Sequence, residues 1–282
     1  MTEATDPWAD RSFLRNVQYK TDGNLAARQS IYAYQHPRID LPARVLDLAV
    51  SGTALSDVAG PESAVTVVDV GCGNGLYLAE LARRGFAGRV VGADLSIGML
   101  SAARQLVGAV TELGPAGWAL GLANADVTAL PFPGGSVDLT LAMHMLYHVP
   151  DWPVAVRELH RVTKPGGRVV IGLNGRDHLT ELRDVIAAVR GFDRASLKER
   201  ADLDTAERLA TAIFTLVTRH DFIAELRVPD AEPLVAYVRS MSGTMHSADR
   251  DGLVTAVLSA LPRTPDGRYK ITSHAGCLIC EV

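Results

Sequence analysis

The sequence predicts an α/β fold of the Rossmann-like type: a three-layer sandwich with helices on both faces of a mostly parallel sheet. Apolar segments of strand length alternate with amphipathic segments of helix length through the middle of the chain. The first strand segment is β-branched throughout Val65–Val68, which is typical of a strand buried on both faces. A turn with three glycines follows this strand and leads into a helix, as at the ligand-binding edge of open α/β sheets.

The strand and helix segments can be placed individually from periodicity, caps and breakers. For example, Ser96 is a suitable N-cap for the helix that ends at Thr111. Strands are predicted at 64–70, 89–93, 118–123, 137–142, 168–173, 215–228 and 268–281, and helices at 11–19, 24–35, 43–58, 76–84, 96–111, 151–162, 177–190, 204–214, 232–241 and 249–260.

Composition excludes several classes of protein. The chain has 282 residues, 48% hydrophobic and 21% charged, with a net charge of −4 and no run of Lys or Arg, which argues against nucleic-acid binding. Its N-terminus is polar, and no segment approaches the roughly 18 apolar residues of a membrane helix. Three cysteines are too few for a disulfide framework. We therefore expect a soluble, cytoplasmic protein with a small-molecule partner, no nucleic acid and no membrane partner, and a homodimer as the candidate assembly.

The strongest motif is the turn Asp69-Val70-Gly71-Cys72-Gly73-Asn74-Gly75. Its glycines stand at positions one, three and five, whereas the dinucleotide fingerprint has its third glycine one residue later, where this chain has Leu76. Asp69 directly precedes the turn, where a carboxylate would repel a pyrophosphate and attract the ammonium of a bound amino acid. The turn therefore favours a ligand with an amino-acid portion over NAD(P), the alternative being a structural turn without a ligand.

Acidic residues also end the next two strands. Asp94 comes 19 residues after Gly75, where a carboxylate can accept hydrogen bonds from both ribose hydroxyls. Alternatively, Asp94 only caps the following helix, a role that Ser96 can also fill. Asp126 could accept a bond from an exocyclic amine while Val127 lies beside a flat base, although an ordinary Asx turn explains Asp126 equally well.

These motifs occur together and in order over residues 64–174. They comprise Asp-x-Gly-x-Gly-x-Gly, the second-strand acid, Asp-x-x-x-Leu-Pro-Phe at 126–132, Val-Asp-Leu at 137–139 and Lys-Pro-Gly-Gly at 164–167. As a set they resemble class I S-adenosylmethionine-dependent methyltransferases of the ubiquinone/menaquinone-methyltransferase-like, small-molecule type. The resemblance implies S-adenosylmethionine as co-substrate, no metal, and a seven-stranded sheet whose last strand is antiparallel, for which Tyr269–Glu281 is the candidate.

The resemblance also implies roles for individual residues. The glycine turn would pack on the cofactor with Asp69 nearby, and Cys72 would be a small turn residue. Tyr19 and Arg28 would bind the methionine carboxylate or lie near the substrate, the alternative being a helix packed on the sheet edge with Arg28 solvated. The implied cofactor-binding set is Tyr19, Arg28, Asp69, Gly71, Cys72, Gly73, Asn74, Gly75, Asp94 (ribose), Leu95 and Met99 (flanking the base), Asp126 and Val127 (adenine), and His144.

The domain organisation follows from the same resemblance. Residues 1–60 are expected to form an N-terminal helical lid or cap. Residues 61–282 are expected to form the domain that binds S-adenosylmethionine, with residues 175–265 contributing helices to the acceptor pocket.

His144 and His148 follow the strand at 137–142, at the sheet edge where open α/β sheets bind ligands. Either is a candidate general base if the acceptor must lose a proton. A zinc site is the alternative for the pair, but no glutamate lies between them and no third ligand is evident. A structural role is the alternative for His148. Cys277 and Cys280 are spaced by three, which places them on opposite faces of a strand.

The predicted function is methyl transfer from S-adenosylmethionine to a small-molecule acceptor through oxygen, nitrogen or carbon. The alternatives are an NAD(P)-type Rossmann oxidoreductase and a non-catalytic protein that binds S-adenosylmethionine. The glycine spacing and Asp69 disfavour the first alternative, whereas cofactor-binding residues alone do not distinguish the second.

Overall fold

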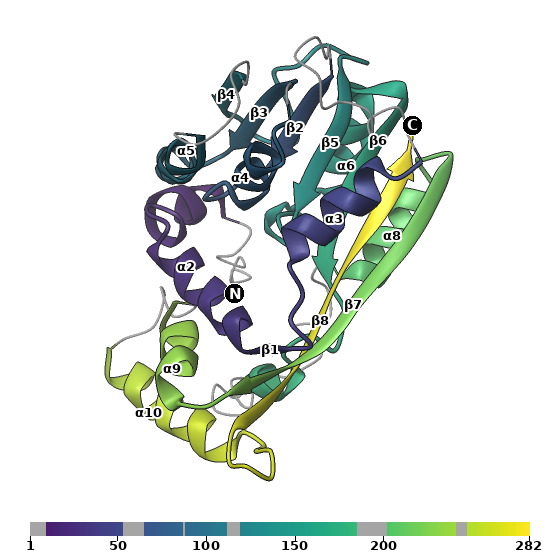
Figure 1. Ribbon diagram of the computed structural model, residues 1–282. Coiled ribbons are helices and arrows are strands. Elements are labelled where there is room, and N and C mark those ends of the chain that lie inside the picture. The colour runs from purple at the N-terminus through teal and green to yellow at the C-terminus, as the bar shows by residue number, and fades with distance from the viewer. Residues whose placement is uncertain (1–9, 53–64, 87, 112–118, 185–201, 241–246) are drawn as a thin grey trace, which may run out of the picture.

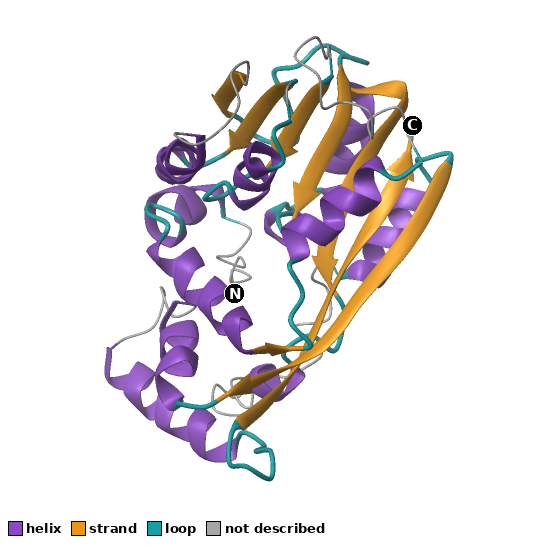
Figure 2. Ribbon diagram, viewed as in Figure 1, coloured by secondary structure: helices purple, strands orange, loops and turns teal. Residues whose placement is uncertain are grey.

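One mixed sheet organises the computed structural model, which describes residues 10–52, 65–86, 88–111, 119–184, 202–240 and 247–282. The sheet has eight strands in the order β1-β7-β8-β6-β5-β2-β3-β4. Helices lie on both faces (Figures 1 and 2), which confirms the predicted three-layer α/β class. Its strands are β1 (Gln35–His36), β2 (Thr66–Val70), β3 (Arg89–Asp94), β4 (Ala119–Asn124), β5 (Val137–Met143), β6 (Thr163–Asn174), β7 (Leu216–Val228) and β8 (Tyr269–Glu281).

The strand directions agree with the prediction. β4, β3, β2, β5 and β6 are parallel neighbours, and β8 lies antiparallel between β6 and β7. The antiparallel last strand is therefore confirmed at Tyr269–Glu281. The eighth strand, β1, was not predicted: it has two residues, Gln35 and His36, paired with β7, and two residues are too few to show a strand period.

Several helices begin at a residue whose side chain caps them. Asp40 and Asp151 each accept a bond from a first-turn backbone N–H, and each is followed by a proline in the first turn of its helix. The predicted helices at 43–58 and 177–190 run partly outside the described residues. The helices are α1 (Arg11–Phe13), η2 (Leu14–Gln18), α2 (Gly23–Ser30), η3 (Ile31–Tyr34), α3 (Leu41–Val50), α4 (Leu76–Arg83), α5 (Ile97–Thr111), η5 (Leu146–His148), α6 (Trp152–Val162), α8 (Leu203–Thr211), α9 (Ala231–Ser240) and α10 (Ser247–Ala260).

Separate apolar cores lie on the two faces of the sheet. α6 and α8 cover one face, and α3, α4 and α5 cover the other. Cys280 belongs to the first core and Cys277 to the second, so the two thiols do face opposite sides of β8. A third core joins η3, α9 and α10 to the far ends of β7 and β8 (Figure 1). No described helix combines the length and apolar character needed to cross a membrane.

Candidate active site

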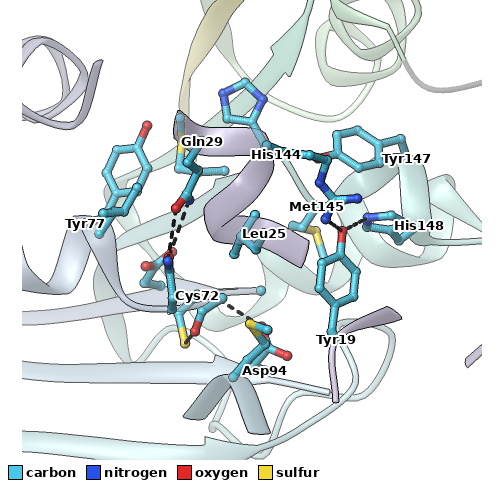
Figure 3. Close-up of a pocket in the computed structure, with 18 of the residues that line it drawn as sticks. Tyr19, Leu25, Gln29, Cys72, Tyr77, Asp94, His144, Met145, Tyr147 and His148 are labelled. Carbon is cyan, nitrogen blue, oxygen red and sulfur yellow. Dashed lines mark hydrogen bonds between the residues drawn. The ribbon is translucent and has the colours of Figure 1, made fainter. Parts of the chain in front are cut away.

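A pocket of about 690 Å³ opens at the carboxyl ends of the parallel strands (Figure 3). The strand ends form its floor, while η2, α2 and η3 from the N-terminal segment form a wall. The structure brings together at this pocket all but one of the residues predicted for the site: Tyr19, Arg28, Asp69, Gly71, Cys72, Gly73, Asn74, Asp94, Leu95, Met99, Asp126, Val127, His144 and His148.

Gly75 is the predicted residue that does not line the pocket. Its backbone has φ +88°, and a Cβ at this position would come within 2.9 Å of the Ala103 Cβ on α5. Gly75 therefore opens α4 and allows α4 to pack closely on α5. By contrast, Gly71 faces the pocket side with φ +68°, where a Cβ would come within 2.7 Å of Met145.

Asp69 is a buried carboxylate with an unused acceptor at the pocket. Asp69 is the last residue but one of β2 and is 1% exposed. Its Oδ2 has no hydrogen-bond partner within the described part of the chain. Burial, and secondarily the negative charge of Asp94, raises the pKa of Asp69 well above its usual value. A buried carboxylate oxygen without a donor is suited to bind a ligand group that carries both a positive charge and an N–H donor.

Asp94 organises the backbone of the glycine turn. Its Oδ2 accepts a bond from the Gly73 N–H (2.9 Å), and its Oδ1 accepts one from the Ser96 N–H (2.8 Å). The Ser96 hydroxyl in turn accepts a bond from Met99 N–H at 3.3 Å, so Ser96 is the residue that caps α5. Asp94 is therefore not the only cap available to α5, and each of its oxygens has a second lone pair that can accept from a further donor.

Asp126 is already paired. Its Oδ2 lies 2.8 Å from Nε of Arg11, and its Oδ1 accepts bonds from the backbone N–H and the hydroxyl of Thr128. From the sequence, Asp126 was expected either to bond an adenine amine or to form an ordinary Asx turn, and its pairing with Arg11 was not predicted. A ligand amine at Asp126 would have to share the carboxylate with the Arg11 guanidinium.

The Tyr19 hydroxyl joins Arg28 to His148, and Figure 3 shows this hydroxyl beside the His148 ring. Nη2 of Arg28 donates to the Tyr19 hydroxyl at 3.0 Å, and this hydroxyl lies 2.7 Å from Nε2 of His148. The Tyr19 ring meets the His148 ring edge to face, with centroids 5.3 Å apart. Arg28 is thus directed into the pocket, and His148 is held by a residue of the N-terminal segment.

The N-terminal segment contacts the glycine turn and α5 at further points. The Ser96 hydroxyl donates to the Tyr19 carbonyl at 2.7 Å. The amides of Gln29 and Asn74 bond each other reciprocally, at 3.0 and 3.4 Å. On α5, Gly98 lies so close to this segment that a Cβ would overlap the Lys20 carbonyl. The segment is therefore fitted against the residues expected to hold the cofactor.

His144 occupies a special backbone position directly after β5. Its φ is +53°, an uncommon value for a residue with a side chain, and its N–H donates to the Gly172 carbonyl at 2.8 Å. Burial lowers the pKa of His144 to about 4, so the imidazole is neutral near pH 7. His144 and His148 are not on one helix face, because η5 begins only at Leu146.

Several pocket residues were missed by the sequence argument. The Tyr77 hydroxyl is buried without a hydrogen-bond partner in the described structure. Tyr147 and Tyr237 line the pocket from η5 and α9. His178, from the segment after β6, pairs with the hydroxyl of Tyr32 at 2.9 Å. The signal that could have found Tyr77 is a phenol on a helix beside the crevice, but the same pattern is typical of ordinary core packing.

Two histidines of this pocket are expected to make the protein sensitive to acid. Burial is the main cause that lowers the pKa of His144 to about 4 and of His178 to about 3, below the usual 6.5. The unfolded chain therefore takes up protons first, so stability is full above pH 6.5 and falls as the pH drops toward 4. Each group accounts for a loss on the order of 3 kcal/mol. Urea unfolding at pH 7 and 4.5 measures this loss, and His144→Gln should reduce it; equal losses in both proteins would contradict the assignment.

Metal-ligand groups do not gather in the described part of the chain. No group of three or more His, Cys, Asp or Glu side chains there is arranged to hold an ion. Cys72, Cys277 and Cys280 are free and buried, and burial raises the pKa of each thiol. These thiols are therefore protonated near neutral pH and unsuited to act as nucleophiles.

The fold and pocket define the class: an α/β protein that binds a nucleotide-type ligand at the carboxyl ends of a parallel sheet. A family model described as a methyltransferase domain matches residues 68–171. A malonyl-[acyl-carrier protein] O-methyltransferase of Erwinia pyrifoliae is 31% identical over 210 residues, which cover 72% of each chain. A demethylmenaquinone methyltransferase of Deinococcus radiodurans is 33% identical over 148 residues, 51% of this chain and 59% of that one.

Solved structures show the same fold. Phosphoethanolamine N-methyltransferase 2 of Haemonchus contortus, in complex with S-adenosyl-L-methionine, superposes with a TM-score of 0.56 at 20% identity. The match covers 96% of this chain and 59% of that one. The family is shown by the Erwinia relative, which is more than 30% identical over more than two thirds of each chain: this chain belongs to the class I S-adenosylmethionine-dependent methyltransferases.

Proposed function

We propose that this enzyme transfers the methyl group of S-adenosylmethionine to a small-molecule acceptor held between the strand ends and the N-terminal helices. The observation that carries the proposal is Asp69, which lines the pocket and whose buried Oδ2 accepts no hydrogen bond from any described residue. The ammonium of a methionine moiety would supply that donor, whereas a pyrophosphate would be repelled. The relatives named above act on an acyl-carrier-bound acid and on a menaquinone precursor, which supports a metabolite as acceptor.

Different parts of the cofactor would be held by residues from different strand ends and from the N-terminal segment. Asp94 would hold the ribose beside the backbone of Gly73, and Val127 would lie against the adenine near Asp126. Arg28 and Tyr19 would bind the methionine carboxylate, because together they supply a cation and a hydroxyl in the pocket lining. The cofactor supplies an activated methyl group, so the protein's contribution is to orient the acceptor and to exclude water.

The N-terminal segment is proposed to act as the lid of this site, as expected for residues 1–60. Its contacts with the glycine turn and with α5 support closure over the cofactor. Tyr237 and His178 would form the opposite wall, in line with the expected contribution of residues 175–265. His148, held by Tyr19, fits a positioning role better than that of a free base, and His144 is a weak base because of its lowered pKa.

Ligand binding is expected to separate this proposal from the oxidoreductase alternative. S-adenosylhomocysteine should raise the melting temperature by several degrees, because a ligand that binds only the native state stabilises it by mass action. NAD should have no effect, because Asp69 stands where a pyrophosphate would have to lie. Differential scanning fluorimetry measures both, and stabilisation by NAD alone would refute the proposal. Transfer of label from S-adenosylmethionine to a metabolite extract then separates an enzyme from a protein that only binds the cofactor.

A further inference from the structure

Strand β7 has a long outer side that no other strand covers. β7 lies near the edge of the sheet (Figure 1), and β1 pairs with its outer side only at Leu226 and Glu225. Within the described part of the chain, no strand pairs with the outer side of residues 216–224, which we call the open edge. Native proteins usually keep such edges short or place lysines and prolines on them. The open edge has nine residues and contains no lysine, proline or glycine.

Apolar side chains are exposed at both ends of the open edge. Leu216 is 52% exposed and Ile223 is 64% exposed. They are two of the four large hydrophobic side chains that are exposed in the described residues. Apolar side chains on an unpaired strand favour pairing with a strand of another chain.

The position of the open edge indicates how two copies of β7 could pair. In an antiparallel pair, side chains directly opposite each other lie on the same face of the sheet. A two-fold axis between two identical strands must therefore pass beside one residue, which then faces its own copy. The middle residue of the open edge is His220. With His220 on the axis, Leu216 lies opposite Ala224 of the second copy, and the pairing of β1 with β7 is left intact.

The charges of the open edge select the same axis. With His220 on the axis, Arg219 lies opposite Asp221 of the second copy, and Asp221 lies opposite Arg219. An axis one residue away places Arg219 against its own copy, or Asp221 against its own copy, and like charges directly opposite each other are destabilising. An axis two residues away either displaces β1 or leaves nearly half of the open edge unpaired.

Both charged side chains lie on the face of β7 that α8 covers. Arg219 is 2.7 Å from Asp204 and 2.9 Å from Glu207, both on α8, and 2.9 Å from Asp221. The side chains of Arg219 and Asp221 nevertheless keep 24% and 33% of their surface exposed. Contacts across the axis would therefore extend a charge network that each copy already contains.

We infer that β7 is a homodimer interface, in which residues 216–224 of two copies pair antiparallel about a two-fold axis at His220. The two sheets then form one continuous sheet. Alternate residue pairs exchange two hydrogen bonds each, so nine opposed pairs give on the order of eight to ten backbone hydrogen bonds. On the α8 face, Val217 packs against Ile223 of the second copy on each side of the central charges. The partner is a second copy because the open edge complements itself in both charge and length.

A single cysteine tests the axis. His220→Cys places two thiols opposite each other, with Cα atoms about 4.5–5.5 Å apart, within the range that a disulfide spans. Thr218→Cys is the matched control on the same face of β7, because its two copies lie four positions apart along the strand, roughly 13 Å. The three natural cysteines are buried. Mild oxidation followed by non-reducing electrophoresis should give mostly covalent dimer from His220→Cys and little from Thr218→Cys. Equal cross-linking of the two variants, or none in His220→Cys, would overturn the inference.

Sedimentation velocity over a range of protein concentrations tests the interface without a cross-link. The wild-type chain should sediment with the mass of two chains and dissociate on dilution. Ile223→Lys places a charge opposite Val217 of the second copy and should raise the dimer dissociation constant at least about tenfold. Ile97→Lys, at a side chain with the same 64% exposure on α5, is the matched control and should leave the dimer unchanged. A wild-type chain that is monomeric at every concentration, or a dimer that Ile223→Lys does not weaken, would show that the open edge is not the interface.

Discussion

Replacement of Asp69 by Asn is expected to weaken binding of S-adenosylhomocysteine strongly while making the ligand-free protein more stable. Loss of one charge from a buried, hydrogen-bonded pair costs about 2–4 kcal/mol, which is roughly 30- to 1000-fold in affinity. Stability should rise because burial opposes ionisation of Asp69 in the folded state, as its raised pKa indicates. Isothermal titration calorimetry and urea unfolding measure the two effects on the same samples.

The dependence on pH gives the same experiment a second readout. A raised carboxyl pKa contributes stability below the usual value of 3.8, and this contribution is lost as the pH rises through the folded-state pKa. Asn does not ionise, so the variant does not lose this stability. The gain in unfolding free energy of Asp69→Asn over wild type should therefore be largest at neutral pH and vanish near pH 3.

Asp138 provides the matched control for Asp69. Its carboxylate is paired with Nζ of Lys164 at 2.7 Å and with the Thr66 N–H at 2.8 Å, and it does not line the pocket. Asp138→Asn should therefore lower stability by about 1 kcal/mol and leave the affinity unchanged. If Asp69→Asn behaved like Asp138→Asn, Asp69 would be a structural carboxylate and the proposed ammonium site would be wrong.

The sequence predicted the parts of the site that are coded locally. The strand Thr66–Val70, its glycine turn and Asp94 lie within a few residues of the breaks that define them, so pattern alone located them. Gly75 shows the limit of that information. The pattern indicates that a glycine is needed at position 75. Only the packing of α4 on α5 shows that the missing Cβ would point at Ala103 and not into the pocket.

Contacts between distant segments were beyond the reach of the sequence. The pair Arg11–Asp126 joins residues separated by more than a hundred positions, and the Tyr32–His178 bond spans 146. The same ring of His178 accepts a bond from the His274 backbone N–H, in a strand near the end of the chain. No periodicity or motif relates such residues, because the relation arises only when the N-terminal segment packs against the loops that follow the strands.

The last prediction concerns the lid and uses two glycines of one helix. Gly98→Ala would place a Cβ against the Lys20 carbonyl, whereas a Cβ at Gly108 in the same helix meets no described atom within 4 Å apart from its own helix backbone. Both substitutions favour a helix by up to about 1 kcal/mol, so Gly108→Ala should be neutral or stabilising and retain activity. Gly98→Ala should displace the Tyr19–Lys20 backbone from α5 and disturb the link from Tyr19 to His148.

Activity of Gly98→Ala is therefore expected to fall by about 100-fold or more, because a misplacement of about 1 Å at positioning residues has effects of this size. The sheet should stay folded, since Gly98 lies near the exposed start of α5 and not in the core. Hydrogen exchange of residues 15–35 should show protection by S-adenosylhomocysteine in wild type and Gly108→Ala, and a clear loss of it in Gly98→Ala. Full activity and unchanged exchange in Gly98→Ala would mean that the Tyr19–Lys20 backbone can move without affecting the reaction. The N-terminal helices would then not be the lid of this enzyme.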